Sequence, residues 1–147
     1  MPADLPGSSN VSDTADTTER PQTRGQLLSA ISNAMVGIHK ECYGKGPTRA
    51  RTIYTEDTVL CRLEEPFMKA EKTLIGVGRT EEVRNMRLAF QRALQDEFVG
   101  AVEGLTGRRV EAFISETHID PDLALEIFLL EEEDAVQPED PSAQETR

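Results

Sequence analysis

The fold is set by residues 110–130, VEAFISETHIDPDLALEIFLL. Apolar residues occupy every second position in both halves of this segment: Val110, Ala112 and Ile114, then Leu123, Leu125, Ile127 and Leu129. A period of two is typical of β-strands, and the polar, proline-containing residues 117–122 between the halves are typical of a turn. The segment therefore predicts a β-hairpin.

The last strand also predicts a contact with another subunit. We interpret its leucine and isoleucine row as the face toward the core. The other face carries Ala124, Glu126, Phe128 and Leu130, so this outer face is only partly polar. Apolar area without a partner inside the chain is typical of an interface, so we predict a homodimer. A monomeric mass, measured by light scattering at micromolar protein concentration, would exclude the homodimer.

A second hairpin is predicted upstream, over residues 50–65, ARTIYTEDTVLCRLEE. Its first half mixes apolar residues with β-branched threonines, and in its second half Val59, Cys61 and Leu63 alternate with polar residues. The turn falls near Glu56-Asp57. Because that turn lacks an Asn-Gly or Asp-Gly pair, the sequence defines the pairing register of the two strands only to within one or two residues.

One helix is predicted before this hairpin and one after it, because apolar residues recur at steps of three or four in both flanking segments. The first runs from about Gly25 to Tyr43 and ends at Gly44, a candidate for a left-handed cap. The second is short, has Pro66 in its first turn and ends at residues 76–78.

A third helix gives the strongest helical pattern of the chain. It is predicted to have Thr80 as its N-cap and to end at Gly107, after about 27 residues. Glycine inside a helix costs about 1 kcal/mol relative to alanine. We therefore expect Gly100 and Gly104 to pack closely against another element.

Together these elements predict a single α+β domain over residues 25–130, in the order α-β-β-α-α-β-β. We expect the two hairpins to join in one four-stranded antiparallel sheet, with the helices packed on one of its faces. The flanking segments are rich in Pro, Ser, Thr and acids and have little to bury. We predict that residues 1–24 form a disordered N-terminal arm and residues 131–147 an acidic, disordered C-terminal tail.

The charge distribution excludes generic nucleic-acid binding. The net charge is −11, and the predicted domain alone carries sixteen acids and thirteen bases. Neutralising phosphates requires a net basic surface, and base stacking lacks support because the chain has no tryptophan. We therefore expect no nucleic-acid partner.

Hydropathy and cysteine content predict the compartment. No apolar run reaches the roughly 18–20 residues of a membrane span, and the N-terminus lacks the pattern of a secretion signal. We expect a cytoplasmic protein that does not itself span the membrane. A peripheral position at the inner face of the membrane is compatible with this expectation. Cys42 and Cys61 form no CxxC pair, so we interpret them as apolar fillers without a redox or zinc role.

Several short motifs occur together in this sequence: Gly44-Lys45-Gly46-Pro47 followed by Arg49 and Arg51, Ile53-Tyr54-Thr55-Glu56-Asp57, Arg84 with Phe90, Thr106-Gly107-Arg108-Arg109-Val110, and Ser115 with the His118-Asp120-Pro121 turn. In combination they resemble the bacterial MpsC-type domain, a family named after a sodium-translocating, membrane-potential-generating system. The resemblance covers residues 25–130 and leaves out both arms.

The resemblance implies association with membrane proteins that move sodium ions or support inorganic-carbon uptake. Since this chain has no ion-conducting segment of its own, the implied function is that of a soluble accessory or regulatory protein. It would be non-catalytic and act by protein–protein contact with a membrane-protein partner. The resemblance supplies no catalytic residues and no cofactor.

The candidate binding site consists of Gly44, Lys45, Gly46, Arg49 and Arg51. Three cations lie within seven residues, and the glycines can turn backbone amides toward an anion, so a phosphate, a carboxylate or an acidic partner would fit. The alternative is a helix C-cap with bases near the negative end of the helix dipole. A sensor that binds an anionic metabolite at this loop is therefore the second functional hypothesis.

No metal site and no catalytic residues are predicted. His118, Asp120 and Asp122 alternate around Pro121, which is ordinary turn chemistry, and we interpret His39 as structural. The serines, cysteines and histidines form no nucleophilic motif, so an enzyme stays the weakest, third hypothesis.

The arginines of the third helix are interpreted as a solvated face whose charges pair with nearby acids: Arg79, Arg84, Arg87 and Arg92.

Overall fold

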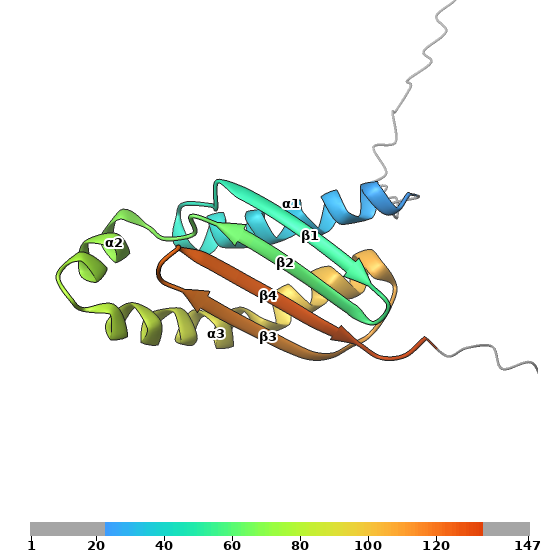
Figure 1. Ribbon diagram of the computed structural model, residues 1–147. Coiled ribbons are helices and arrows are strands. Elements are labelled where there is room, and N and C mark those ends of the chain that lie inside the picture. Colours follow the sequence, from blue (N-terminus) through green and yellow to red (C-terminus); the bar gives the residue numbers. More distant parts are fainter. Residues whose placement is uncertain (1–22, 134–147) are drawn as a thin grey trace, which may run out of the picture.

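The computed structural model describes residues 23–133. Figure 1 shows its elements in the order α1 (Arg24–Tyr43), β1 (Arg49–Thr55), β2 (Thr58–Glu64), α2 (Lys69–Gly76), α3 (Thr80–Thr106), β3 (Val110–His118) and β4 (Leu123–Leu130). The predicted α+β fold and the predicted element order are confirmed. Apart from residues 23–24 and 131–133, the predicted arms lie outside the described residues.

The four strands form one antiparallel sheet in the order β1-β2-β4-β3. Thr55 pairs with Thr58, so the first hairpin turns over Glu56 and Asp57, where the sequence predicts it. Glu56 adopts a positive φ of 49°, which supplies the backbone conformation that glycine or asparagine usually provides in such a turn. The two hairpins join through β2 and β4 at the centre of the sheet.

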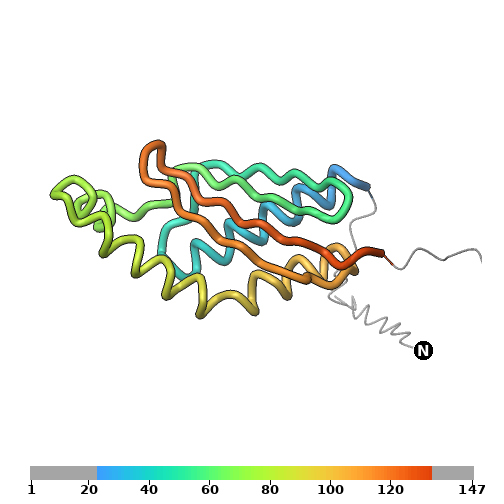
Figure 2. The backbone as a smooth tube through the Cα atoms, turned by 60° about the horizontal axis from the view of Figure 1, so that its bottom comes forward, coloured from blue at the N-terminus to red at the C-terminus, as the bar shows by residue number. Residues whose placement is uncertain are grey.

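Helices α1 and α3 cover one face of this sheet, as Figures 1 and 2 show from two directions. Helix α2 lies beyond the end of the strands and contacts α3. The core fills the space between the two layers, where Ile31 and Met35 of α1 belong to one cluster with Val59 of β2 and Phe128 of β4. None of the helices described within residues 23–133 is long and apolar enough to cross a membrane.

Helix α1 has the boundaries that its sequence predicts to within one residue. Thr23 is the N-cap: its hydroxyl accepts the N–H of Gln26 at 3.1 Å, and the Gln26 side chain accepts the N–H of Thr23 at 3.3 Å. At the other end Gly44 is left-handed, with φ 76°, and its N–H donates to the carbonyl of Lys40 at 2.9 Å. The predicted left-handed cap is confirmed.

Helix α2 begins later than predicted. Pro66 does not lie in its first turn, because the helix starts at Lys69. The residues before it are used differently: Phe67 is buried in the core, and the N–H of Met68 donates to the Glu71 side chain at 2.9 Å. Burial of the aromatic ring thus holds this segment extended.

The predicted N-cap of α3 is also wrong. Thr80 is the first helical residue, and the cap position is Arg79, which makes no side-chain cap bond. Gly78 has a positive φ of 81°, and the N–H of Arg79 donates back to the Leu74 carbonyl at 2.8 Å. The tight return from α2 therefore fixes where α3 can begin.

The orientation of β4 is the reverse of the predicted one. Its buried row, which faces the helices, is Ala124, Glu126, Phe128 and Leu130, each at most 2% exposed. The leucine and isoleucine row that we interpret from sequence as the core face is only half-buried and lies on the opposite side of the sheet. The outer face of β4 is therefore entirely apolar.

The expected close packing at Gly100 and Gly104 is wrong as well. Both residues are exposed, and a Cβ at either position would meet no neighbouring atom within 4 Å. Gly100→Ala and Gly104→Ala should each stabilise the protein by about 0.5–1 kcal/mol, because alanine has the higher helix propensity. Urea denaturation followed by circular dichroism measures this.

The contrasting variant is Gly107→Ala at the end of α3. Gly107 has a φ of 70°, which alanine adopts only with strain, so this substitution should destabilise the protein. Equal effects at all three positions would contradict the assignment.

Candidate functional site

The face of the sheet turned away from α1 and α3, here called the open face, is uncovered within the described residues. In every strand the residues on the helix side are the more buried ones, and those between them lie on the open face. The apolar members of the open face come from all four strands: Ile53, Leu60, Ala112, Ile114, Leu123, Leu125, Ile127 and Leu129. A contiguous apolar surface of this kind marks an interaction site.

The strand register arranges the open face in four rows that run across the sheet. The first row contains Thr55, Thr58, Leu129 and Ala112, and the second contains Ile53, Leu60, Ile127 and Ile114. The third row contains Arg51, Arg62, Leu125 and Glu116, and the fourth contains Arg49, Glu64, Leu123 and His118. The face is thus apolar near the first hairpin turn and charged at its other end.

The most exposed large apolar side chains of the open face lie in its second row. Ile53 is 53% exposed and Ile114 is 42% exposed, and they stand on the two edge strands β1 and β3. Both side chains are already about half-buried, so completing their burial is favourable by roughly half of the 1.5–3 kcal/mol of a fully exposed side chain, about 1 kcal/mol each. A partner that covered the full width of the sheet would bury both.

Three exposed arginines make up the basic end of the open face: Arg49, Arg51 and Arg62. Arg51 stands directly opposite Arg62 on the neighbouring strand, an arrangement that is unfavourable for like charges. The Nε atom of Arg62 lies 3.6 Å from a carboxylate oxygen of Glu64. An acidic group brought to this end would relieve the repulsion.

The structure divides the predicted binding loop into two parts. Gly44 is the cap of α1, and the ammonium of Lys45 donates to the carbonyl of Phe67 at 3.2 Å. Gly46 packs so closely that a Cβ there would lie 3.3 Å from Cγ1 of Val36. Arg49 and Arg51 point instead to the open face, where Arg62, which the sequence reasoning missed, joins them. The β1–β2 pairing of the hairpin is the signal that would have found it.

The turn between β3 and β4 uses its histidine internally. Nδ1 of His118 lies 2.7 Å from the carbonyl oxygen of Pro121. Between residues 23 and 133 no cluster of three or more His, Cys, Asp or Glu side chains is placed to hold a metal ion.

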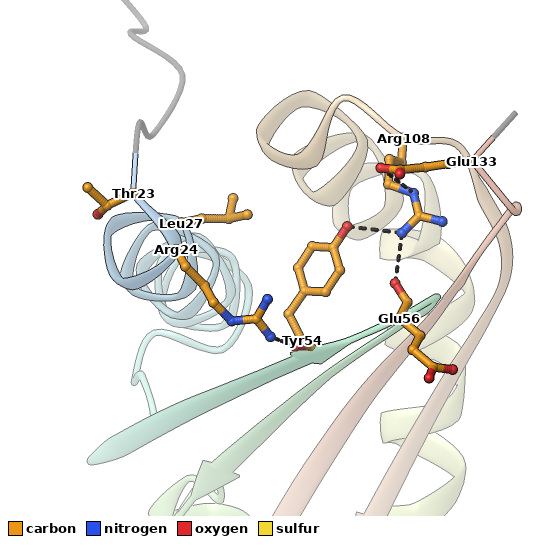
Figure 3. A pocket seen from close by; sticks show the side chains of 7 residues that line it. All are labelled: Thr23, Arg24, Leu27, Tyr54, Glu56, Arg108 and Glu133. Atoms are coloured by element: carbon orange, nitrogen blue, oxygen red, sulfur yellow. Dashed lines mark hydrogen bonds and ion pairs between the residues drawn. The ribbon is translucent and has the colours of Figure 1, made fainter. Parts of the chain in front are cut away.

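Arg108 holds the first hairpin turn against the end of β4 (Figure 3). Its guanidinium donates to the Tyr54 hydroxyl at 3.1 Å, to the Glu56 carbonyl at 2.8 Å and to the Asp57 carboxylate at 2.6 Å. A further bond reaches the carbonyl of Glu131 at 2.7 Å. The hydrogen bond to Asp57, followed by the one to Tyr54, raises the pKa of Arg108. The Thr-Gly-Arg-Arg motif thus has a structural role through its first arginine.

A pocket of about 370 Å³ lies beside this arginine. Figure 3 shows Arg24 reaching from α1 to the backbone carbonyl of Tyr54, with Arg108 on the other side of the ring. Thr23 and Glu133, at the two ends of the described chain, both line the pocket. Both guanidinium groups already bind protein groups, but Nε of Arg108 has no hydrogen-bond partner within the described part of the chain and lies 3.7 Å from a carboxylate oxygen of Glu133.

One of the four arginines interpreted as solvated is buried. Arg87 is only 2% exposed and pairs with Glu71, which is 1% exposed. Its position four residues after Val83 places it on the apolar stripe of α3, a spacing that the interpretation as a charged face overlooked. The neighbouring Arg84 is exposed and lies 3.5 Å from Glu81, as predicted for a helix surface.

A second buried pair links α1 to the centre of the sheet. Nε2 of His39 lies 3.2 Å from a carboxylate oxygen of Glu126, and the two residues are 3% and 1% exposed. Nδ1 of His39, the second carboxylate oxygen of Glu126 and the Ser115 hydroxyl have no hydrogen-bond partner within the described part of the chain. The histidine ring also packs against Tyr43 and Phe98, so the pair belongs to the core.

Comparison with known proteins identifies one family. Residues 23–132 match the family model described as Na+-translocating membrane potential-generating system (MpsC). No curated protein and no solved structure is similar enough to the chain to count as a match. The match spans every helix and strand described above.

Proposed function

The chain belongs to the MpsC family, and from this membership we propose that it is a non-catalytic accessory or regulatory protein of a sodium-translocating, membrane-potential-generating system. It acts by contact with a membrane protein of that system, at the inner face of the membrane. The family description associates the chain with such a system, and the mode of action is our proposal.

The observation that supports the contact mechanism is the basic end of the open face, where Arg49 stands exposed in the outermost row. An exposed cation at the rim of a protein surface supports binding of an acidic macromolecule, because charge steers its approach and fixes its orientation. The buried ionisable pairs Arg87–Glu71 and His39–Glu126 serve packing between elements. They do not form a site that a substrate reaches.

A protein partner is favoured over a small anionic metabolite. Arg49 and Arg51 stand on a strand face beside apolar side chains, and the third cation of the loop, Lys45, is bound to a backbone carbonyl. Two arginines on a sheet surface enclose little of a small ligand, whereas an acidic protein surface can contact both. Arg49, in the outermost row, is the residue we assign to the membrane partner.

Arg49→Glu should abolish recovery of the membrane partner. The full-length tagged protein is captured from detergent-solubilised membranes of its native host, and co-purifying integral membrane proteins are identified by mass spectrometry. Reversing a charge at a polar rim weakens association strongly, because attraction becomes repulsion. The wild-type protein should recover a sodium-translocating membrane protein that the variant loses.

The matched control is Arg92→Glu, the same charge change at an exposed position of α3. In the host, deletion of the gene should lower the sodium-dependent membrane potential, and the wild type and Arg92→Glu should restore it where Arg49→Glu does not. If both variants recovered the same membrane proteins and restored the potential equally, the proposed contact would be wrong.

A further inference from the structure

We propose that the open face is covered by a second copy of this chain, with a two-fold axis parallel to the strands. The two four-stranded sheets then pack face to face as a sandwich, with the helices on both outer surfaces. This inference goes beyond the proposed function and does not depend on it, because it follows from the pattern of the sheet alone. The outermost row, which contains Arg49, lies at the end of the sandwich, where a membrane partner can still reach it.

The row pattern selects the direction of the axis. Aligned sheets pack with their strands within about 30° of each other. An axis parallel to the strands places each row against the same row of the second copy, β1 over β3 and β2 over β4. In the second row Ile53 then meets Ile114 of the other copy, and Leu60 meets Ile127. An axis across the strands would instead place this apolar row against charged side chains.

The two edge positions of the third row are complementary in charge under the same axis. Between them, Arg62 faces Leu125 of the second copy and keeps its own pair with Glu64. Arg51 on β1 faces Glu116 on β3 of the second copy, and the symmetric pair forms at the other edge. Both side chains are exposed in the isolated chain. Neither has its opposite charge as a direct cross-strand neighbour within its own sheet, since Arg51 pairs with Arg62 and Glu116 with Leu125. The dimer therefore gives each charge an opposite partner.

The size of the face is sufficient for a reversible dimer. Four strands about 4.8 Å apart and four rows about 7 Å apart give roughly 500 Å² per copy. Two copies together bury about 1,000 Å², which is near the lower limit for a specific interface. We expect a dimer whose population depends on protein concentration in the micromolar range.

Charge reversal tests the pairing of Arg51 with Glu116. Sedimentation equilibrium of the full chain should give twice the 16.3 kDa protomer mass for the wild type at high micromolar concentration. Arg51→Glu alone and Glu116→Arg alone should each raise the dimer dissociation constant about tenfold or more, because each variant places two like-charged pairs in the interface. Arg92→Glu should leave the dissociation constant unchanged.

Mixing the two weakened variants is the decisive step. In a heterodimer of Arg51→Glu with Glu116→Arg, both edge pairs are again of opposite charge. The mixture should therefore dimerise nearly as well as the wild type, although neither variant does so alone. Ile53→Asp should prevent dimerisation in any mixture, because it buries a charge in the apolar row.

A wild-type chain that stays monomeric, or single variants that dimerise like the wild type, would overturn the proposal. So would a mixture that stays as weak as its components, while circular dichroism shows all chains folded. The proposed function can fail separately, since it is read from the recovery of membrane proteins, whereas self-association is read from sedimentation of the Arg51 and Glu116 variants. Sedimentation of Arg49→Glu shows whether its place in the outermost row also affects the dimer.

Discussion

Arg87→Ala should lower the free energy of unfolding by about 3–5 kcal/mol, the usual cost of removing one partner from a buried ion pair. The guanidinium binds Glu71 through two bonds of 2.6 Å and donates to the Pro66 carbonyl at 2.8 Å. It also lies 3.8 Å from the centroid of the Tyr43 ring. Its removal takes the charged donor from the buried Glu71 carboxylate, which keeps the N–H of Met68, and leaves the buried Pro66 carbonyl without the guanidinium.

The expected loss of stability is large because Arg87 contacts three separate segments of the chain. Glu71 belongs to α2, Pro66 to the segment before it and Tyr43 to the end of α1, so one side chain fixes α2 to the rest of the domain. Urea denaturation at a fixed protein concentration measures the effect. The fixed concentration matters because dimerisation would add to the apparent stability.

Two further variants separate charge from packing. Arg84→Ala removes an exposed arginine whose pair with Glu81 is worth at most about 1 kcal/mol. The double variant Arg87→Met, Glu71→Leu removes both charges and should recover a large part of the loss, because no uncompensated charge stays buried. An Arg87→Ala protein as stable as Arg84→Ala would contradict the role of this pair.

The stability of the protein should fall as the pH rises above 9. Burial raises the pKa of the Cys61 thiol from 9.0 to about 11, with a smaller opposing effect of the Thr52 hydrogen bond. Burial likewise raises the pKa of Tyr43 from 10.0 to about 12. In both cases the folded chain keeps a proton that the unfolded chain releases.

The sign and the size follow from this difference. Well below pH 9 both groups are protonated in both states, so the stabilisation is complete there. Between pH 9 and 11 the unfolded chain gains by ionising Cys61, and the free energy of unfolding falls by up to about 1.4 kcal/mol per pH unit. Two units correspond to a loss of roughly 3 kcal/mol from this thiol alone.

Urea denaturation between about pH 8 and pH 10, under reducing conditions, measures the slope. Cys61→Ala should be less stable at every pH because it leaves a small cavity, but its slope should be clearly flatter. Cys42→Ser is the control, since Cys42 is only half-buried and its thiol should account for the smaller part of the slope. Parallel curves for the wild type and Cys61→Ala would show that burial of this thiol does not cause the loss.

The hairpins and α1 were predictable from the sequence because local information determines them. Period-two alternation and the left-handed Gly44 lie within short segments, and the structure places them as the pattern indicates. The face of β4 was not predictable in this way. Both of its rows are largely apolar, and the row that carries Glu126 is buried because His39, 87 residues away in the sequence, supplies the partner.

The same distinction explains the errors at the candidate site. Arg87 is charged and was assigned to solvent, although its buried partner Glu71 lies on another helix. Arg62 belongs to the basic end of the open face because the pairing of β1 with β2 places it opposite Arg51. A pattern within one segment does not predict the environment of a side chain when that environment depends on contacts between distant elements.

Charges of opposite sign lie at the two ends of the strands in the described domain, acids beside Arg108 and arginines at the other end. Thr23 and Glu133 lie beside this arginine at the turn end of β1 and β2, so the terminal segments are attached there. The described residues at this end include Glu131, Glu132 and Glu133, whereas the basic end of the open face lies roughly 20 Å away, at the other end of the strands. A charged partner approaching such a molecule exerts a torque that turns the basic end toward a negative surface before contact. With a two-fold axis along the strands, the dipoles of two copies add instead of cancelling, so dimerisation would strengthen this orientation.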